Sequence, residues 1–266
     1  MFCGHSLGGD QRDRTLDRML GTSMAFVFQD PLGSFNPVIR MGAQIAEVAT
    51  EHVGLERGKA LARAHQRLGQ VGLRDPSRCL ASYPHQLSGG MLQRSMIGMG
   101  LMAKPRLLIA DEPTTALDVT VQKQVLDLID TVCDEQDAGL LLISHDLAVV
   151  AQRCDRVLVM YAGRIVEDLD ASALAAGGNH PYTRALRASV LEMDCDKSVP
   201  IAAIAANAGT RSASTGCDFA LRCPRARKAC FDSAPALTQP KPGHRIACWN
   251  PYPAPAEDSE AQGDAA

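Results

Sequence analysis

Residues 87–94 read LSGGMLQR and residues 107–113 read LLIADEP, and these two stretches decide the fold. A Ser-Gly-Gly step before a helical pattern is suited to hold an anion, because glycines let the backbone come close and the first helical N–H groups point at the ligand. The second stretch is an apolar run that ends in Asp111 and Glu112. We expect a strand that delivers two carboxylates to its carboxyl end, one suited to Mg²⁺ and the other to an attacking water.

Composition narrows the class of protein. The chain has 266 residues, with 27 Lys and Arg against 30 Asp and Glu, so its formal net charge is −3. This balance, with only 4% aromatic residues, predicts no nucleic-acid partner. The N-terminal stretch lacks a signal-peptide pattern, and no apolar run approaches the roughly 20 residues of a membrane-spanning helix. We therefore expect a cytosolic chain whose nine cysteines are reduced thiols or metal ligands.

Strand and helix patterns alternate along the first two thirds of the chain. Strands are predicted at residues 24–28, 107–110, 140–144, 157–161 and 164–168, the last two joined by an Ala-Gly turn. Helices are predicted at residues 40–53, 56–71, 88–102 and 119–135. The alternation predicts an α/β fold on a mostly parallel sheet, in which the strands at 140–144 and 157–161 are buried.

Two more polar residues follow predicted strands. Gln29 comes directly after the strand at 24–28, in FVFQDP, and His145 follows the strand at 140–144, in LLISHDL. Ligands of open α/β sheets bind beyond the carboxyl ends of the strands. An amide at Gln29 can contact Mg²⁺ and a water, and an imidazole at His145 can donate a hydrogen bond to a phosphate oxygen.

Together, LSGGMLQR, LLIADEP, the Ala-Leu-Asp at 116–118 and LLISHDL resemble the motifs of the ATP-binding-cassette (ABC) ATPases, over roughly residues 20–250. The resemblance implies an ABC-type P-loop NTPase core over residues 1–190, with an inserted helical subdomain at about 31–104. It also implies ATP hydrolysis with Mg²⁺.

The resemblance implies a role for each residue of the hydrolytic site. Asp111 and Gln29 would serve Mg²⁺, Glu112 would polarise the attacking water, and His145 would contact the γ-phosphate.

Other residues are implied to act on a second subunit. Ser88, Gly89 and Gly90 would close over the nucleotide of a second ABC ATPase subunit, and Asp118 would belong to a D-loop that crosses the interface. This arrangement is a head-to-tail dimer with two composite sites.

Two further motifs narrow the subfamily. NHPYT at 179–183 and QDPLGSFNP at 29–37 resemble the ATPase subunits of dipeptide/oligopeptide importers, and nickel importers share these features. The resemblance implies a peripheral subunit at the cytoplasmic face of the inner membrane, where residues 30–37 face one of two membrane-spanning permease subunits. A solute-binding protein would be an indirect partner. The alternative of a soluble, non-transport ABC protein is disfavoured, because the chain has neither a second cassette nor a long coiled coil.

A phosphate-binding G-x-x-x-x-G-K-[ST] loop does not occur in the sequence. The nearest pattern, GHSLGGDQ at residues 4–11, has Asp10 and Gln11 where Lys and Ser or Thr are required. We expect this pattern to follow the phosphate loop of the family. The chain thus resembles a family member without its Walker A portion, predicted to be inactive alone. The alternative to an ATP-hydrolysing subunit is a catalytically incompetent cassette that supplies only the LSGG half-site to its partner. A misassigned start codon, a frameshift and a true truncation would all produce this pattern.

The sequence changes character after about residue 190. We predict a linker at 191–216, a Cys-rich C-terminal module at 217–249 and a disordered tail at 250–266. The module contains four cysteines that suggest a metal site: Cys217, Cys223, Cys230 and Cys248. The C-x2–4-C pairs typical of zinc sites are absent, and some importers of this family carry a [4Fe–4S] cluster here, so the resemblance favours the cluster over zinc. Packing of the four side chains as small hydrophobes stays open.

Overall fold

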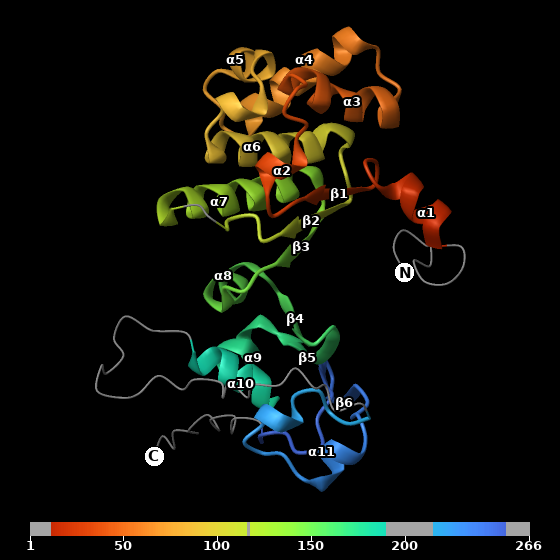
Figure 1. Ribbon diagram of the computed structural model, residues 1–266, viewed down its shortest axis with the longest axis vertical. Coiled ribbons are helices and arrows are strands. Elements are labelled where there is room, and N and C mark those ends of the chain that lie inside the picture. The colour runs from red at the N-terminus through yellow and green to blue at the C-terminus, as the bar shows by residue number, and fades with distance from the viewer. Residues whose placement is uncertain (1–11, 116–117, 190–214, 254–266) are drawn as a thin grey trace, which may run out of the picture. The chain divides into compact units, whose positions relative to one another are not determined.

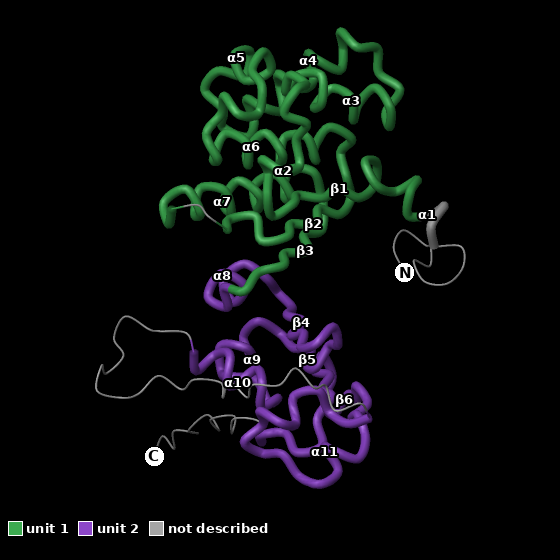
Figure 2. The backbone as a smooth tube through the Cα atoms, viewed as in Figure 1, with its two compact units in different colours: residues 1–145 green, residues 146–266 purple. Residues whose placement is uncertain are grey.

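The computed structural model describes residues 12–115, 118–189 and 215–253. The chain forms two compact units, residues 1–145 and 146–266 (Figure 2). The pattern at 4–11, nearly all of the predicted linker and most of the predicted tail lie outside the described residues. In the part that is described, no helix is both long and apolar enough to cross a membrane.

Unit 1 is built on a parallel sheet of three strands, in the order β1-β2-β3. These strands are β1 (Met24–Val27), β2 (Leu107–Asp111) and β3 (Gly139–Ile143), so the predicted strands in this unit are confirmed to within a residue or two. Val27 is paired with Ala110, and Ala110 with Leu142. Because the strands are parallel and in register, the loops that follow them leave from the same edge of the sheet.

Most helices of unit 1 lie on one side of this sheet and form a layer of their own (Figure 1). The α-helices of unit 1 are α1 (Arg12–Met19), α2 (Pro31–Ser34), α3 (Met41–Val53), α4 (Arg57–Gln70), α5 (Pro76–Ala81), α6 (Gly89–Gly100) and α7 (Val119–Gln136). Short 3-10 turns lie at Pro84–Gln86 and Leu101–Ala103. Helices α3 to α6 share a core of fully buried side chains, among them Met41, Ile45, Leu68, Met96 and Ile97. The predicted helices of this unit are confirmed.

The prediction that residues 140–144 form a buried strand is wrong. None of the residues of β3 is buried, and Leu141 and Ile143 are 43% and 44% exposed. Leu140 and Leu142 pack against the core of unit 1, whereas Leu141 and Ile143 point to the opposite face, which the described residues leave exposed. An apolar run predicts burial only where neighbouring elements cover both faces of the strand.

Unit 2 contains a separate antiparallel sheet, in the order β4-β5-β7-β6, so the expectation of a mostly parallel sheet holds for unit 1 and not for this part of the chain. The strands are β4 (Arg156–Tyr161), β5 (Arg164–Asp170), β6 (Thr238–Lys241) and β7 (His244–Ile246). The predicted Ala-Gly turn joins β4 to β5, with a positive φ at both Ala162 and Gly163. The helices are α8 (Leu147–Arg153), α9 (Ala171–Ala175), α10 (Pro181–Ala188) and α11 (Lys228–Asp232), with a 3-10 turn at Ala220–Arg222.

Strand β4 was also expected to be buried, but it alternates. Val157 and Val159 are buried, whereas Leu158 and Met160 are 45% and 57% exposed. Val157 and Val159 belong to the core of unit 2, whereas Leu158 and Met160 point to the opposite face, which the described residues leave exposed.

Two consecutive carboxylates on β5 are completely buried. Asp168 accepts hydrogen bonds from Arg156 on β4, at 2.6 Å, and from Arg245 on β7, at 2.7 Å. The Arg156 hydrogen bond makes the largest contribution to lowering the pKa of Asp168, while burial opposes it. A buried charge is tolerated when it is paired in this way. Asp168 therefore ties β7, which belongs to the cysteine module, to the hairpin formed by β4 and β5.

The neighbouring Glu167 explains the NHPYT motif. Its carboxylate accepts hydrogen bonds from the backbone N–H groups of Asn179 and His180, at 2.7 and 3.0 Å, and it pairs with His244 at 2.9 Å. The His180 side chain caps α10 by accepting from the N–H of Tyr182, at 3.0 Å. These contacts anchor the beginning of α10 to β5, so the motif is structural in this unit.

His180 should make the stability of unit 2 depend on pH. Burial lowers the pKa of His180 from 6.5 to about 4, although Glu167 opposes this shift. Between these values the unfolded chain binds more protons than the folded chain, so the free energy of unfolding rises with pH and is lost as pH falls from 6.5 towards 4. The shift corresponds to a loss of about 3 kcal/mol, at 1.36 kcal/mol per pKa unit.

The measurement is urea unfolding between pH 4 and 7, followed by the fluorescence of Trp249, the only tryptophan of the chain. His180→Asn should flatten the dependence, because Asn can still cap the helix but does not titrate. The exposed His85 provides the control, and His85→Asn should leave the wild-type dependence intact. An equally steep dependence in His180→Asn would contradict the assignment.

Candidate functional site

Glu112 lies one residue beyond β2 and has a strained backbone. Its φ of +44° is in the left-handed region, which is costly for a residue with a side chain. The N–H of Glu112 donates to the carbonyl of Ile143 on β3, at 2.9 Å, and the N–H of Thr115 donates to the carbonyl of Glu112, at 3.1 Å. One bond ties Glu112 to the neighbouring strand, and the other closes a tight turn. Strain of this kind concentrates at functional sites.

Three side chains converge on the Glu112 carboxylate. Gln29 Nε2 and Thr115 Oγ1 each donate to Oε2, at 2.8 Å, and His145 Nδ1 lies 3.0 Å from Oε1. The His145 side chain is 75% exposed and the Glu112 side chain 25% exposed, so the group opens to solvent. The structure thus brings together Gln29, Glu112 and His145, which the sequence placed after three different strands.

These contacts set the charge of Glu112. The hydrogen bond with His145 lowers the pKa of Glu112 most, the bond from Thr115 lowers it next, and partial burial opposes them. Glu112 is therefore ionised at neutral pH. A carboxylate with a lowered pKa is a weak proton acceptor. Glu112 is therefore better suited to orient and polarise a water through a hydrogen bond than to take a proton from that water.

Asp111 is the last residue of β2, half-buried, and its register partner is Ile143. In the described residues no three His, Cys, Asp or Glu side chains form a group that could hold a metal ion. Mg²⁺ in nucleotide sites uses one or two carboxylates together with phosphate oxygens and waters, so a site with few protein ligands fits it. Asp111 and the amide oxygen of Gln29 supply oxygen ligands of the required kind, and their role stays a prediction.

Ser88, Gly89 and Gly90 lie at the start of α6, as predicted. Ser88 is exposed and caps the helix by accepting a hydrogen bond from the N–H of Met91, at 3.4 Å. A side chain added at Gly89 would meet no atom within 4 Å, so the backbone is open to a ligand there. Within the described part of the chain, no hydrogen bond links this segment to Glu112.

Asp118 has a structural role that the sequence did not predict. Its side chain caps α7 by accepting a hydrogen bond from the N–H of Val121, at 3.0 Å. Val121 also lies beside Gly90, since a side chain added at that glycine would come within 3.6 Å of it. The beginnings of α6 and α7 are therefore neighbours in unit 1. Residues 116 and 117 of the predicted D-loop lie outside the described residues.

The four predicted cysteine ligands all belong to unit 2, and a backbone hydrogen bond joins two of them. The N–H of Cys217 donates to the carbonyl of Cys230 at 2.7 Å. Burial raises the pKa of Cys217 and Cys223, and raises that of Cys248 to about 11, and neighbouring thiols of the group add to each increase. Their side chains as placed do not form a group that could hold a metal ion, within the residues described. The four cysteines as a ligand set, and the metal that they would bind, therefore stay a prediction.

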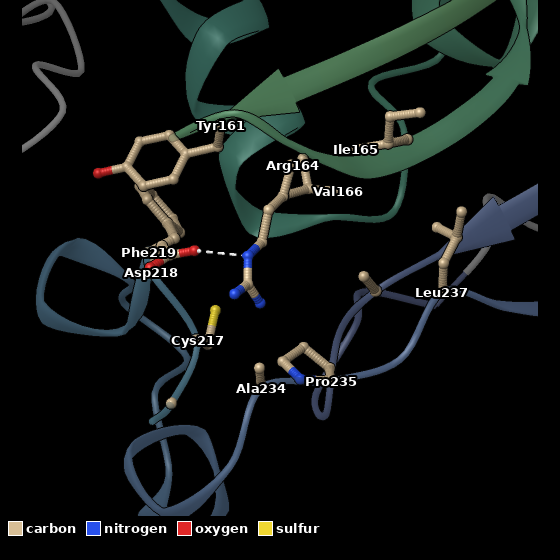
Figure 3. A pocket seen from close by; sticks show the side chains of 12 residues that line it. Tyr161, Arg164, Ile165, Val166, Cys217, Asp218, Phe219, Ala234, Pro235 and Leu237 are labelled. Atoms are coloured by element: carbon tan, nitrogen blue, oxygen red, sulfur yellow. Dashed lines mark ion pairs between the residues drawn. The ribbon is translucent and has the colours of Figure 1, made fainter. Parts of the chain in front are cut away.

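A cavity of about 80 Å³ adjoins Cys217 (Figure 3). Figure 3 shows Arg164 reaching from β5 towards Asp218, with which it pairs at 3.5 Å. Much of the remaining lining is apolar and includes Leu237 and Phe219. Pockets for nucleotide-sized ligands measure several hundred Å³, so this cavity does not compete with the Glu112 site for ATP.

Sequence reasoning missed Thr115 and Glu167. A threonine in a turn is common, and an acidic residue in a hairpin strand usually faces solvent, so neither position carried a pattern. Only the tertiary contacts identify the partners of these side chains.

Two family models match the chain. The model described as "ABC transporter" matches residues 6–115, and the model described as "Oligopeptide/dipeptide transporter, C-terminal region" matches residues 166–230. The second match covers the NHPYT motif and three of the four cysteines of the module.

Curated relatives extend these matches over nearly the whole chain. A probable peptide ABC transporter ATP-binding protein of Sinorhizobium fredii, y4tR, is 46% identical over 238 residues, which cover 89% of this chain and 71% of the relative. The dipeptide transport ATP-binding protein DppD of Escherichia coli is 42% identical over 233 residues, covering 88% of this chain and 71% of the relative.

Solved structures agree on the fold. The ATP-binding cassette MJ0796 bound to ADP and phosphate superimposes with a TM-score of 0.54 at 23% identity, covering 61% of this chain and 68% of that structure. CbiO1 of Clostridium perfringens superimposes with a TM-score of 0.56 at 24% identity, covering 66% and 67%.

The fold, and the polar group at the carboxyl edge of its parallel sheet, define an ABC ATPase cassette. At 38–46% identity to relatives matched over some 71% of their length, the chain belongs to the family of ATP-binding subunits of peptide ABC transporters. The family resemblance drawn from the sequence motifs is confirmed.

Proposed function

We propose that this chain is the energy-coupling, ATP-hydrolysing subunit of an importer for dipeptides or oligopeptides. The observation that carries the proposal is the convergence of Gln29 and His145 on Glu112, at the edge of the sheet where ligands of α/β proteins bind. The relatives named above as peptide and dipeptide transport proteins support the choice of substrate over nickel. They also support a transport role over that of a soluble, non-transport ABC protein.

Each residue of the group has a task in this proposal. Glu112 accepts a hydrogen bond from the attacking water and orients it, which its ionised state permits. His145 donates a hydrogen bond to the γ-phosphate, and its exposed ring can turn from Glu112 to the phosphate. Asp111 and Gln29 hold Mg²⁺, which neutralises phosphate charge when it is bound. Positioning and charge neutralisation supply most of the catalysis in phosphoryl transfer.

The segment after Gln29 is suited to contact a membrane subunit. Three of its apolar side chains face solvent, with Val38 78% exposed, Leu32 53% and Ile39 41%, while Phe35 is buried in the core. Exposed apolar side chains grouped along one segment indicate a protein interface. In the proposal, this surface docks on one of two membrane-spanning permease subunits at the cytoplasmic face of the inner membrane, where the chain is peripheral. A solute-binding protein delivers the peptide to the permease.

Ser88, Gly89 and Gly90 are proposed to act on the nucleotide of a second ATPase subunit, in a head-to-tail dimer. The support is their exposed place at the start of α6, with no hydrogen bond to Glu112 in the described residues. The N-terminal N–H groups of α6 offer the charge that a phosphate requires.

Replacing Ser88 by Arg should therefore block hydrolysis at the partner's nucleotide. The bulky cation removes the helix cap and fills the space left open at Gly89. The measurement is ATP turnover of the assembled transporter, compared with nucleotide binding by the separate partner subunit. The matched control is Ser77→Arg, on the exposed side of the helical layer, with wild-type turnover expected. Normal turnover in Ser88→Arg would contradict action in trans.

The chain on its own is proposed not to hydrolyse ATP. Its sequence contains no G-x-x-x-x-G-K-[ST] loop, which supplies the backbone cradle and the lysine for the β- and γ-phosphates. The purified 266-residue chain should show no Mg²⁺-dependent turnover above that of Glu112→Gln. Turnover at ordinary transporter rates that Glu112→Gln abolishes would refute this proposal. A chain inactive alone could still supply the LSGG half-site to an active partner.

A second proposal concerns the cysteine module, where Cys217, Cys223, Cys230 and Cys248 would hold a [4Fe–4S] cluster. The supporting observation is the backbone contact inside the module, where the N–H of Cys217 donates to the carbonyl of Cys230 at 2.7 Å, and burial raises the pKa of Cys217, Cys223 and Cys248. Anaerobic purification should give brown protein with broad absorption near about 400 nm, typical of such clusters. One zinc per chain would favour zinc instead. If the protein contains no metal and the Cys217→Ser variant is as stable as wild type, the four cysteines serve only as small packing side chains. Cys79 is the control for the Cys217 substitution, because it is a buried cysteine outside the module and forms a hydrogen bond with Ser95.

A further inference from the structure

We propose that Thr115 is a positioning residue for Glu112: its hydroxyl holds one carboxylate oxygen in place when the other two donors leave. Thr115 Oγ1 donates to Glu112 Oε2 at 2.8 Å, as short as the bond from Gln29 to the same oxygen. Thr115 itself is exposed, so this contact does not follow from packing of its side chain in the core.

The three donors differ in how they are connected to Glu112. Thr115 lies only three residues away, in the turn closed by the hydrogen bond from its own N–H to the Glu112 carbonyl. Gln29 is 83 residues away in sequence and His145 is 33 residues away, each at the end of another strand. A movement of either loop breaks its bond to Glu112, whereas Thr115 moves together with the turn.

The local connection of Thr115 to Glu112 becomes important when Gln29 turns to Mg²⁺ and His145 turns to the nucleotide. At this step the inference rests on the proposed function. The terminal torsion of a glutamate side chain is broad, so a carboxylate without a donor samples many orientations. With Thr115 in place, Oε2 keeps one donor and Oε1 is free to face the attacking water. Thr115 therefore supplies pre-organisation and touches neither substrate nor metal.

The test is a ¹³C titration of the Glu112 carboxyl in the full chain, with labelled glutamate and with the resonance assigned by its loss in Glu112→Gln. Thr115→Val removes the hydroxyl but keeps the shape, so the midpoint of the Glu112 titration should rise. Thr115→Ser should restore the wild-type midpoint.

Thr114→Val is the matched control, because Thr114 makes no hydrogen bond to Glu112 among the described residues. A wild-type midpoint in Thr115→Val, or the same rise in Thr114→Val, would overturn the positioning role. Thermal unfolding of each variant confirms that the compared chains are folded. The titration needs no ATP turnover, so an assembled transporter that does not hydrolyse ATP would count against the proposed function and leave this result unaffected.

Discussion

The left-handed turn at Glu112 is the constraint on which the site depends. A hydrogen bond to Ile143 fixes the Glu112 backbone beside β3 at the edge of the parallel sheet. Because β1, β2 and β3 run in register, the residues that follow them leave from one edge, and Gln29 and His145 reach the same carboxylate. The strained backbone is tolerated because hydrogen bonds on both sides of the residue hold it in place.

Unit 2 is organised around buried charge instead of a parallel sheet. Glu167 and Asp168 are consecutive residues of β5, so their side chains point to opposite faces of the sheet. Glu167 anchors the beginning of α10, and Asp168 joins β4 to β7 through two arginines. A cysteine module of some thirty residues has little apolar surface to bury, so these ion pairs and hydrogen bonds define where it attaches. Loss of one partner would leave a buried carboxylate uncompensated.

Tyr252, near the end of the described residues, also helps to attach the cysteine module to the rest of unit 2. Tyr252 lies between two guanidinium groups, 4.2 Å from that of Arg184 and 4.5 Å from that of Arg225. Its N–H also donates to the carbonyl of Asn179, at 2.9 Å. Contacts between an aromatic ring and two cations are favourable. They connect α10, the cysteine module and the segment beyond Trp249 within unit 2.

Local sequence determined the helices and strands of unit 1 and the residues that follow its strands. Periodicity and caps are properties of neighbouring residues, so the helices at 41–53, 57–70 and 119–136 could be read directly. The carboxyl-edge group of Gln29, Glu112 and His145 could be anticipated, because strand ends are visible in sequence.

Tertiary structure decided the rest. The exposure of β3, the antiparallel sheet of unit 2 and the burial of Glu167 depend on which distant segments cover a strand, and an apolar pattern does not contain this information. The bond from Thr115 to Glu112 is local in sequence, yet it forms because the backbone at Glu112 is left-handed and held by β3. The backbone bond from Cys217 to Cys230 likewise requires the fold of the module, since spacing alone does not bring these two residues together.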